Sequence, residues 1–422
     1  MSNEPLSFEP PRGMRDFYPE DMAWRNRVFD AWRQAATIGG FAPYDACVVE
    51  NLELLQRKAG EEVSEQIYAF EDKSGRKLAL RPEMTPTLAR MIAARQGQLQ
   101  FPVKWFTIAQ CFRYERMTRG RKREHYQWNL DIVGEDRVTA EAEILAAAAR
   151  ALREMGMPDD AYRIRVNNRA LLGELLQKLG VAAPHHAAVF LALDKRGKIS
   201  DEEIAQLLAT AGVPPEVAAK AFEMLAIQSL DQAAAVAGPD SPAIAQLREL
   251  FTLAELHGFA DRLIFDMAVI RGLTYYTGIV FEAFDTARKF RAIFGGGRYD
   301  SLLTTIGGAP TPAVGLGFGD VVVLEVLREQ PGVSATLARD GAIIGFMLPE
   351  QRDAAIRLAT RLRAEGTRVD LGLAPQKPKQ FFARAGASAC LSAIFLGPDD
   401  VAKGSARLKN LETREEREIA LG

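Results

Sequence analysis

The runs 104–115 and 125–134 constrain the fold more than any other feature, because both show the period-two alternation of a β-strand. The connection between them is short, so we expect the two strands to pair as an antiparallel hairpin. The second strand carries Gln127, Asn129 and Asp131 on one face and apolar residues on the other. Two amides and a carboxylate can hold an amine or an imidazole through hydrogen bonds. A solvated strand face is the alternative interpretation of the same pattern.

The connection between these strands is strongly cationic. Six of its eleven residues are basic, and within this stretch only Glu115 opposes them. Such a density of charge repels itself unless an anion binds, and guanidinium groups suit phosphates. A solvated charged turn is the plainer alternative. We call residues 113–123 the cationic loop; its basic members are Arg113, Arg116, Arg119, Arg121, Lys122 and Arg123.

Three further motifs stand in the second half of the chain. Arg271 precedes a glycine and is soon followed by Tyr275 and Tyr276, which together offer a cation, close backbone approach and two phenol donors. The stretch 294–300 has three consecutive glycines, which let backbone lie against a flat ligand, although a hairpin turn would also need them. The glycines in 315–319 lack the spacing of a dinucleotide fingerprint, so we discount that interpretation.

The composition is ordinary for a soluble globular protein, and 422 residues predict two or three domains. The formal net charge is −2, so any nucleic-acid site must be a local patch. The N-terminal residues show no signal-peptide pattern, and no apolar stretch is long enough to span a bilayer. We therefore expect a cytoplasmic protein without a membrane part. Neither the three cysteines nor the four histidines have a spacing that suggests a metal site.

Periodicity indicates how the rest of the chain is organised. It predicts a helix over 20–39, a hairpin over 68–80 and a helix over 139–155. Residues 172–258 are rich in alanine and helical, and we interpret them as an inserted subdomain. From residue 341 onward strands and helices alternate, which predicts a small α/β unit with a parallel or mixed sheet. That unit has 13 basic and 10 acidic residues, so it is slightly basic.

Taken in order, these segments resemble the class II histidyl-tRNA synthetases over nearly the whole chain. The resemblance implies an α/β (α+β) fold with an antiparallel catalytic sheet flanked by helices. It also implies a helical insertion and a C-terminal α/β anticodon-binding domain. The motifs that carry the resemblance lie at 11–16, 81–85, 112–127, 271–276, 295–300 and 313–315.

The resemblance also implies a domain division and an activity. The catalytic core would lie in two parts, 1–171 and 259–330, on either side of the insertion at 172–258, and the anticodon-binding domain would span 341–422. Members of this family are histidine–tRNA ligases, so we expect an enzyme that activates L-histidine with ATP and Mg²⁺. It would transfer the histidyl group to tRNA(His) and act as a homodimer.

The resemblance assigns roles to the polar residues of the motifs. Two arginines would act in catalysis by holding the α-phosphate of ATP from opposite sides, namely Arg113 and Arg271. The remaining contacts to ATP would come from Arg121 and Arg123. The residues that would hold histidine are Glu83, Thr85, Gln127, Asp131, Tyr275 and Tyr276. The acceptor end of the tRNA would meet Arg116, Arg119 and Lys122.

The chain departs from the family pattern at four positions. Asp131 stands where the family often has glutamate, and Thr274 stands where aspartate is common. Cys47 replaces a proline in motif 1, near the expected dimer interface. Val322 stands where motif 3 usually carries an arginine that clamps the γ-phosphate of ATP. One contact to the ATP tail is therefore expected to be absent or supplied from elsewhere.

The missing motif 3 arginine favours a second hypothesis. In it the protein is an inactive, histidine-binding regulatory subunit of ATP phosphoribosyltransferase. Against this stand Arg113, Arg121 and Arg271, together with the C-terminal unit, which such regulators usually lack. A third hypothesis is a ligase that adenylates an amino acid without tRNA. The cationic loop and the C-terminal unit argue against that one as well.

Overall fold

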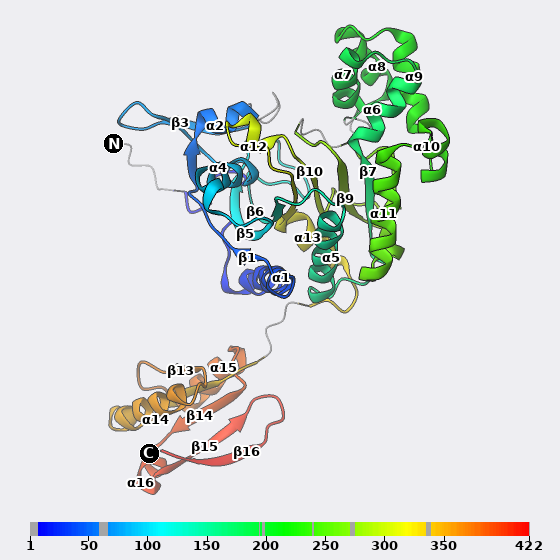
Figure 1. The fold of residues 1–422 in the computed structure, drawn as a ribbon. Coiled ribbons are helices and arrows are strands. Elements are labelled where there is room, and N and C mark those ends of the chain that lie inside the picture. Colours follow the sequence, from blue (N-terminus) through cyan, green and yellow to red (C-terminus); the bar gives the residue numbers. More distant parts are fainter. Residues whose placement is uncertain are drawn as a thin grey trace. The chain divides into compact units, whose positions relative to one another are not determined.

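The computed structural model describes residues 7–58, 66–193, 195, 199–238, 240–270, 275–334 and 339–421. The chain divides into two compact units, Met1–Ser334 and Ala335–Gly422 (Figure 1). Each unit has a sheet and a hydrophobic core of its own. No helix within the described residues is long and apolar enough to cross a membrane.

The first unit is built on an eight-stranded sheet. Its inner strands pair antiparallel, and only the short strands at the two edges pair parallel with their neighbours. The predicted fold class, an antiparallel-rich sheet flanked by helices, is thus confirmed. In spatial order the strands are β1 (Ala42–Pro43), β5 (Val103–Phe112), β6 (Glu124–Val133), β11 (Ala313–Gly319), β10 (Phe294–Arg298), β9 (Ile279–Asp285), β7 (Tyr162–Asn168) and β8 (Leu263–Phe265).

The predicted hairpin is formed by β5 and β6, which pair along their whole length with Phe112 opposite Glu124. On one face of β6, Trp128 and Leu130 are fully buried in the main hydrophobic core. The opposite face carries the polar residues. The period-two pattern therefore assigned these side chains to their faces correctly.

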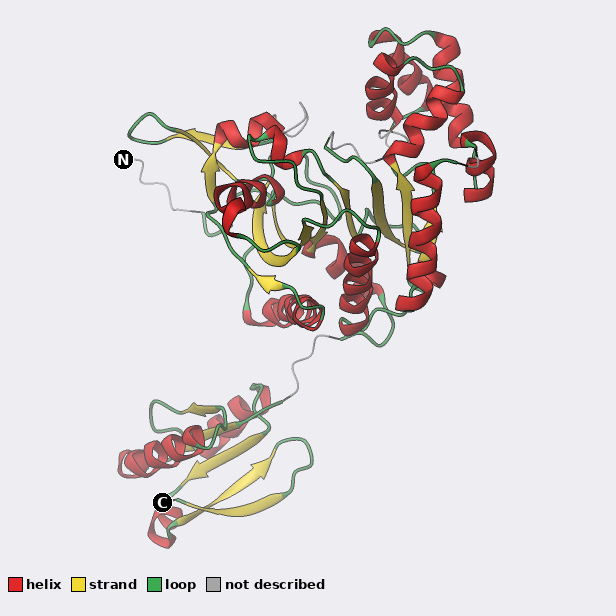
Figure 2. Cartoon of the chain, viewed as in Figure 1, coloured by secondary structure: helices red, strands yellow, loops and turns green. Residues whose placement is uncertain are grey.

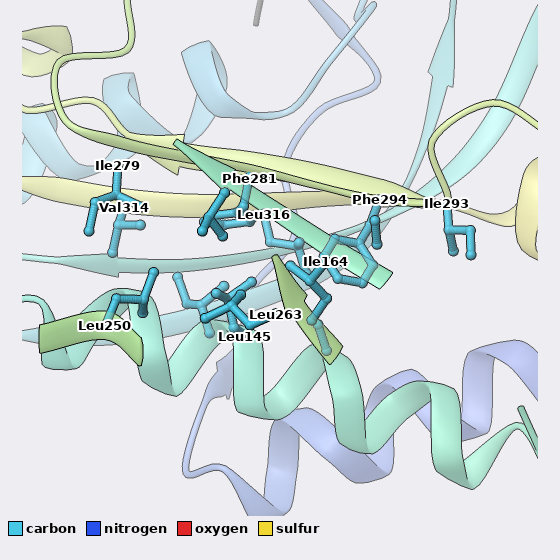
Figure 3. Close-up of a cluster of buried hydrophobic side chains, with 14 of the residues drawn as sticks. Leu145, Ile164, Leu250, Leu263, Ile279, Phe281, Ile293, Phe294, Val314 and Leu316 are labelled. Atoms are coloured by element: carbon cyan, nitrogen blue, oxygen red, sulfur yellow. The ribbon is translucent and has the colours of Figure 1, made fainter. Parts of the chain in front are cut away.

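Helices cover the apolar face of the sheet. Figure 3 shows Leu145 and Leu250 lying beneath the strands that carry Phe281 and Leu316. The first helix begins at a proline and ends at two glycines, and Gly40 has a left-handed φ of +74° that stops the helix. The predicted helices over 20–39 and 139–155 are confirmed. The covering helices are α1 (Pro19–Ile38), α5 (Thr139–Glu154), α11 (Pro242–His257) and α13 (Asp320–Glu329).

A small three-stranded sheet and a group of short helices complete the part of the unit near the N-terminus. The predicted hairpin over 68–80 is confirmed, and Asp72 accepts hydrogen bonds from the backbone N–H groups of Ser74 and Arg76 in its turn. The strands, in order, are β2 (Val49–Asn51), β4 (Lys77–Leu80) and β3 (Tyr68–Glu71). The helices are α2 (Leu52–Lys58), α4 (Thr85–Arg95), η1 (Gln96–Gln98) and α12 (Leu302–Thr305).

Between β7 and β8 the described residues form a series of helices joined by short loops, drawn red and green in Figure 2. The polar starts of these helices follow known capping chemistry; for example, Ser200 and Glu203 form a reciprocal capping box. The helices before α11 are α6 (Arg169–Lys178), α7 (Ala183–Leu193), α8 (Asp201–Thr210), α9 (Pro215–Leu225) and α10 (Leu230–Ala237), and η2 (Ala260–Arg262) follows α11.

The second unit has a five-stranded mixed sheet, as the alternation of strands and helices predicted. Three parallel strands at one side are extended by an antiparallel hairpin at the other. In spatial order the strands are β13 (Val369–Leu371), β12 (Ala342–Phe346), β14 (Ser392–Leu396), β15 (Ser405–Asn410) and β16 (Glu416–Ala420). The helices are η3 (Pro349–Gln351), α14 (Arg352–Ala364), α15 (Pro378–Ala387) and α16 (Pro398–Lys403).

Candidate active site

A cavity of about 630 Å³ lies on the face of the large sheet that carries Gln127. Its floor is formed by β6 and β11, and its walls come from the cationic loop, the start of α13 and the connection between β9 and β10. We call it the central cavity. The charged and polar residues that line it are Arg113, Glu115, Arg121, Lys122, His125, Gln127, Asp266, Glu282, Arg288 and Arg291.

The floor of the site is open because β11 presents glycines to it. In the register of β6 and β11, Gly315 stands opposite Asp131. A Cβ at Gly315 would lie 2.1 Å from Oδ1 of Asp131, and a Cβ at Gly317 would lie 3.1 Å from Nε2 of Gln127. Any side chain at Gly315 would therefore displace the polar groups of β6. Discounting the dinucleotide fingerprint in 315–319 was correct, because these glycines lie within a strand.

The polar face of β6 forms a hydrogen-bonded row. Nε2 of Gln127 donates to Oδ1 of Asn129 at 2.8 Å, and the ring Nε2 of His125 lies 3.3 Å from Oε1 of Gln127. Burial lowers the pKa of His125 to about 3, and the neighbouring cation Arg113 adds to this effect. The imidazole of His125 is therefore neutral at physiological pH. No pattern in the sequence assigns a chemical role to His125.

Further along β6, Asp131 lies in a buried polar cluster and is not among the residues that line the central cavity. Tyr299 donates a hydrogen bond to Oδ1 of Asp131 at 2.6 Å, while Oδ2 has no hydrogen-bond partner among the described residues. Burial raises the pKa of Asp131 to about 7, although the Tyr299 hydroxyl opposes the rise. The hydroxyl of Tyr44 is also buried without a described partner, and burial and Asp131 both raise its pKa. A ligand with an N–H group would satisfy the free carboxylate oxygen.

Sequence reasoning missed both Tyr299 and Tyr44. Tyr299 directly follows the three glycines of β10 and an arginine, so the motif 294–300 did contain the signal. That motif predicts a surface for a flat ligand or a hairpin turn, and neither interpretation gives a role to Tyr299. Tyr44 stands outside every motif, and no local pattern in the sequence points to it.

Four of the residues predicted to hold histidine lie beside this cluster. The hydroxyl of Tyr275 donates to Oε2 of Glu83 at 3.3 Å, and both residues are buried. The rings of Tyr275 and Tyr276 are 4.7 Å apart, and Tyr299 meets Tyr275 edge to face. Thr85 is buried at the first residue of α4, just after Glu83. Contacts thus run from Glu83 through two tyrosines to Asp131.

The two ends of the cationic loop differ in their surroundings. Arg113 lines the central cavity and donates from Nε to the carbonyl oxygen of Pro82 at 2.9 Å. No carboxylate among the described residues lies within ion-pair distance of Arg113. Arg123 is not among the residues that line the cavity, and its guanidinium stacks 3.9 Å above the ring of Tyr114.

The middle of the cationic loop is partly neutralised by carboxylates. Arg121, which lines the cavity, pairs with the buried carboxylate of Glu115. Arg119 pairs with Glu329 at 2.5 Å and Glu325 at 3.4 Å, both on α13. The fold therefore brings two carboxylates to this loop beyond the single one found within its sequence. The other two predicted tRNA contacts, Arg116 and Lys122, are both exposed.

Two further positions singled out from the sequence are Arg271 and Val322. Arg271 and its neighbours up to Thr274 lie outside the described residues. Val322 lies in the first turn of α13 and forms part of the cavity wall. A Cβ built at Gly120 would lie 3.4 Å from Cγ2 of Val322, so this valine packs beneath the turn of the cationic loop.

Behind the site, Arg15 from the N-terminal motif joins β6 to α13. Its guanidinium pairs with Glu124 at 2.5 Å and with Asp320 at 3.0 Å. Asp320 also accepts a hydrogen bond from the backbone N–H of Tyr126 at 2.9 Å. Burial raises the pKa of Asp320 to about 6, and the charge of Arg15 opposes the rise. This network fixes the start of α13 against the strand that carries Gln127.

Two family models match the chain along almost its whole length. The model of the family described as histidyl-tRNA synthetase matches residues 13–319, and that of an anticodon binding domain matches residues 342–422. The chain is 41% identical over 416 residues to a histidine–tRNA ligase, chloroplastic/mitochondrial, of Arabidopsis thaliana, covering 99% of this chain and 86% of that one. It is 38% identical to the histidine–tRNA ligase of Opitutus terrae, covering 98% and 96% of the two chains.

The fold is likewise that of a solved relative. The crystal structure of histidyl-tRNA synthetase from a Nostoc species superposes with a TM-score of 0.81 at 24% identity, covering 99% of this chain and 97% of that one. The sequence matches extend through both compact units of the chain. The chain therefore belongs to the histidyl-tRNA synthetase family, as its motifs predicted.

Proposed function

We propose that this protein is a histidine–tRNA ligase, which activates L-histidine with ATP to histidyl-adenylate and transfers the histidyl group to tRNA(His). One observation carries the proposal beyond family membership. Arg113, a cation without a described carboxylate partner, lies at one end of the polar face of the sheet. Asp131, with a free carboxylate oxygen, lies toward the other end. We therefore expect an anion at one end of this face and an imidazole toward the other.

The first step brings two anions together, because the carboxylate of histidine attacks the α-phosphorus of ATP and pyrophosphate leaves. Cations must hold the phosphate and stabilise the charge that develops on it. We assign this role to Arg113 from one side and to Arg271 from the other. The position of Arg113 on the wall of the central cavity supports its part in the assignment. The part of Arg271 rests on the resemblance alone.

We assign the recognition of histidine to the polar groups around Asp131. Gln127, Glu83 and Thr85 would hold the α-amino group, while Asp131 would accept from the imidazole. Tyr275 and Tyr276 would complete the site. The free oxygen of Asp131 supports this assignment, because an amino acid without a matching N–H would leave that oxygen unpaired.

We assign the remaining cations to the ATP tail and to the tRNA. Arg121 and Arg123 would bind the tail, and Arg121 is supported by its place in the cavity wall. Arg116, Arg119 and Lys122 would meet the acceptor end of the tRNA. Contact with tRNA would require Arg119 to exchange its carboxylate partners for phosphates.

We propose that Mg²⁺ accompanies the phosphates of ATP. The described residues form no cluster of three possible metal ligands. Such a cluster is not needed, because Mg²⁺ commonly takes one or two carboxylates and completes its shell with phosphate oxygens and water. Glu115, Asp266 and Glu282 line the central cavity and are the carboxylates within reach of a bound nucleotide. When bound, Mg²⁺ would neutralise the charge of the departing pyrophosphate.

A homodimer and a cytoplasmic location stay predictions. The dimer is supported by exposed apolar side chains on and beside the small sheet, namely Val48, Val49 and Phe70. Sedimentation velocity at micromolar concentration would decide the oligomeric state. Location requires fractionation of cells, since one of the similar ligases is named as chloroplastic/mitochondrial.

Charging of tRNA with radiolabelled histidine tests the proposal. The wild-type protein should charge tRNA(His) and catalyse histidine-dependent ATP–pyrophosphate exchange. Arg271→Ala should reduce exchange by about 100-fold or more, as expected for loss of an electrostatic clamp. Arg137→Ala is the matched control, because Arg137 is exposed and, among the described residues, its side chain pairs with Glu135 alone. Near-normal exchange in Arg271→Ala would remove the assigned role.

The regulatory hypothesis makes the opposite prediction. Val322 gives the cavity no cation where motif 3 usually has an arginine, and this observation favours a protein that binds histidine without using ATP. Binding of histidine by calorimetry, combined with no exchange at saturating ATP, would establish that hypothesis in place of the ligase.

A further inference from the structure

The side of the central cavity formed by α13 carries no positive charge. The described residues of α13 that line the cavity are Val321 and Val322, and both are buried. Asp320, one residue earlier, is held by Arg15 and by a backbone N–H group of β6. Val322 packs against the turn of the cationic loop at Gly120. A phosphate at this end of the cavity therefore needs a cation from another element.

The connection between β9 and β10 supplies such a cation from a different wall. Arg288 and Arg291 both line the central cavity. Arg288 is exposed, and no carboxylate among the described residues lies within ion-pair distance of it. Its guanidinium lies 4.1 Å from the ring centre of Phe284, which also lines the cavity. By contrast, Arg121 is already paired with Glu115.

The turn that carries Arg288 is built by specific hydrogen bonds. The buried carboxylate of Asp285 accepts from the backbone N–H groups of Lys289 at 2.9 Å and Phe290 at 3.0 Å. Thr286 donates its backbone N–H to the carbonyl of Ala161, which ties the turn to the segment before β7. Arg288 has a left-handed φ of +55°, a conformation that costs energy for a residue with a side chain. The fold thus holds Arg288 in one place at an energetic cost.

We propose that Arg288 binds the terminal phosphate of ATP and so replaces the motif 3 arginine that is absent at Val322. The inference rests on the proposed function, because it names the group that holds the nucleotide tail in that reaction. A planar guanidinium can donate two parallel hydrogen bonds to a phosphate. Stacking on Phe284 fixes its plane before the ligand arrives. The arginine that binds the terminal phosphate would thus lie on the β9–β10 connection instead of on α13.

Two variants and a matched control test this role. Arg288→Ala removes the cation, Arg288→Lys keeps the charge but loses the planar fork, and Lys289→Ala alters the next residue, which pairs with Glu329 instead. In ATP–pyrophosphate exchange, Arg288→Ala should raise the KM for ATP about tenfold, as for loss of one charge-assisted hydrogen bond. Its kcat and its KM for histidine should stay near the wild-type values. Arg288→Lys should fall between wild type and Arg288→Ala, and Lys289→Ala should match wild type.

Calorimetry with ATP and with AMP separates this role from a structural one. AMP lacks the β- and γ-phosphates, so Arg288→Ala should weaken binding of ATP and leave binding of AMP unchanged. Equal weakening for both nucleotides would overturn the proposal, as would an unchanged affinity for ATP. Normal exchange with reduced charging would assign Arg288 to the tRNA and also overturn it. If the wild-type protein binds ATP without exchange, the ligase function fails, and the comparison of ATP with AMP still decides the role of Arg288.

Discussion

Asp131 carries a carboxylate that is almost completely buried, and its pKa is raised by that burial to about 7. In the unfolded chain the same group titrates near its ordinary value of 3.8. Between these two values the folded protein binds a proton that the unfolded chain has lost. Stability is therefore lost as the pH rises from about 4 to about 7, and the loss is complete above that range. A group retained at such a cost is typical of a binding site.

Asp131→Asn should reveal this cost. The asparagine can still accept the hydrogen bond from Tyr299 but carries no charge, so the variant should be more stable than wild type at pH 8, by on the order of a few kcal/mol. The difference should shrink as the pH falls toward 4. Urea denaturation at pH 5 and pH 8 measures it, and exchange should show that the variant has lost its use of histidine. Equal differences at both pH values would contradict the assignment of the titration to Asp131.

Some residues of the site could be predicted from the sequence, and others could not. Gln127 and Asp131 were predicted to share a strand face because the period of two is a local property of the chain. Tyr44 and Tyr299 reach Asp131 from distant segments, and only the pairing of strands brings them together. Arg288 was missed for the same reason. A short basic turn predicts no binding role by itself, and only the fold shows that this turn lines a cavity.

The start of α13 shows how an element is positioned by charges that it buries. Asp320 is fully buried, and its countercharge comes from Arg15, more than three hundred residues earlier in the chain. Removing one member of a buried pair leaves an uncompensated charge, whereas an exposed pair contributes little. The N-terminal motif 11–16 thus acts on the site through α13 and β6.

Arg15→Ala should destabilise the protein by about 3–5 kcal/mol at pH 8, where Asp320 is ionised. The loss should be smaller at pH 5, because the pKa of Asp320 is already about 6 with Arg15 present and rises further without it. Thermal denaturation at the two pH values measures both effects. Arg137→Ala, which removes an exposed cation, should change stability little at either pH. A defect in Arg15→Ala that is larger at pH 5 than at pH 8 would contradict this account.

The charge of the cationic loop is partly balanced by carboxylates that lie far away in the sequence. Within its own sequence the loop has one acidic residue, yet the fold adds Glu325 and Glu329 from the next wall. The acidic residues of α13 could be related to the loop only after the sheet was assembled. Mutual repulsion among the cations is therefore weaker than the sequence alone indicated.

At the scale of the whole molecule, the two compact units have separate sheets and separate cores. All described residues assigned here to histidine and ATP lie in the first unit, while the anticodon-binding match lies in the second. The alternation of strands and helices after residue 341 was sufficient to predict the second unit, because that pattern is local. The order of the strands in the large sheet was not predictable in this way, since β11 returns between β6 and β10.

A chain that ends at Ser334 should fold and keep histidine-dependent exchange, since its sheet and cavity are complete. Charging of tRNA should fall by roughly tenfold or more, because contacts to the anticodon are lost and each tenfold corresponds to about 1.4 kcal/mol of binding. Exchange and charging assays on the full chain and the shortened chain measure both. A shortened chain with native circular dichroism but no exchange would show that the units depend on each other for activation.

The bare backbone of β11 beneath the site has a consequence for inhibition. A compound that takes most of its contacts from the strand holding Gly315 and Gly317 would touch no side chain there that mutation could reshape. Resistance would have to come from added atoms, and at Gly315 even one methyl group would lie 2.1 Å from an oxygen of Asp131. Such a change would also displace the carboxylate of Asp131, the group proposed to accept from the imidazole of histidine. At the glycines of β11, mutations that confer resistance to such a compound should therefore also impair the activity of the protein.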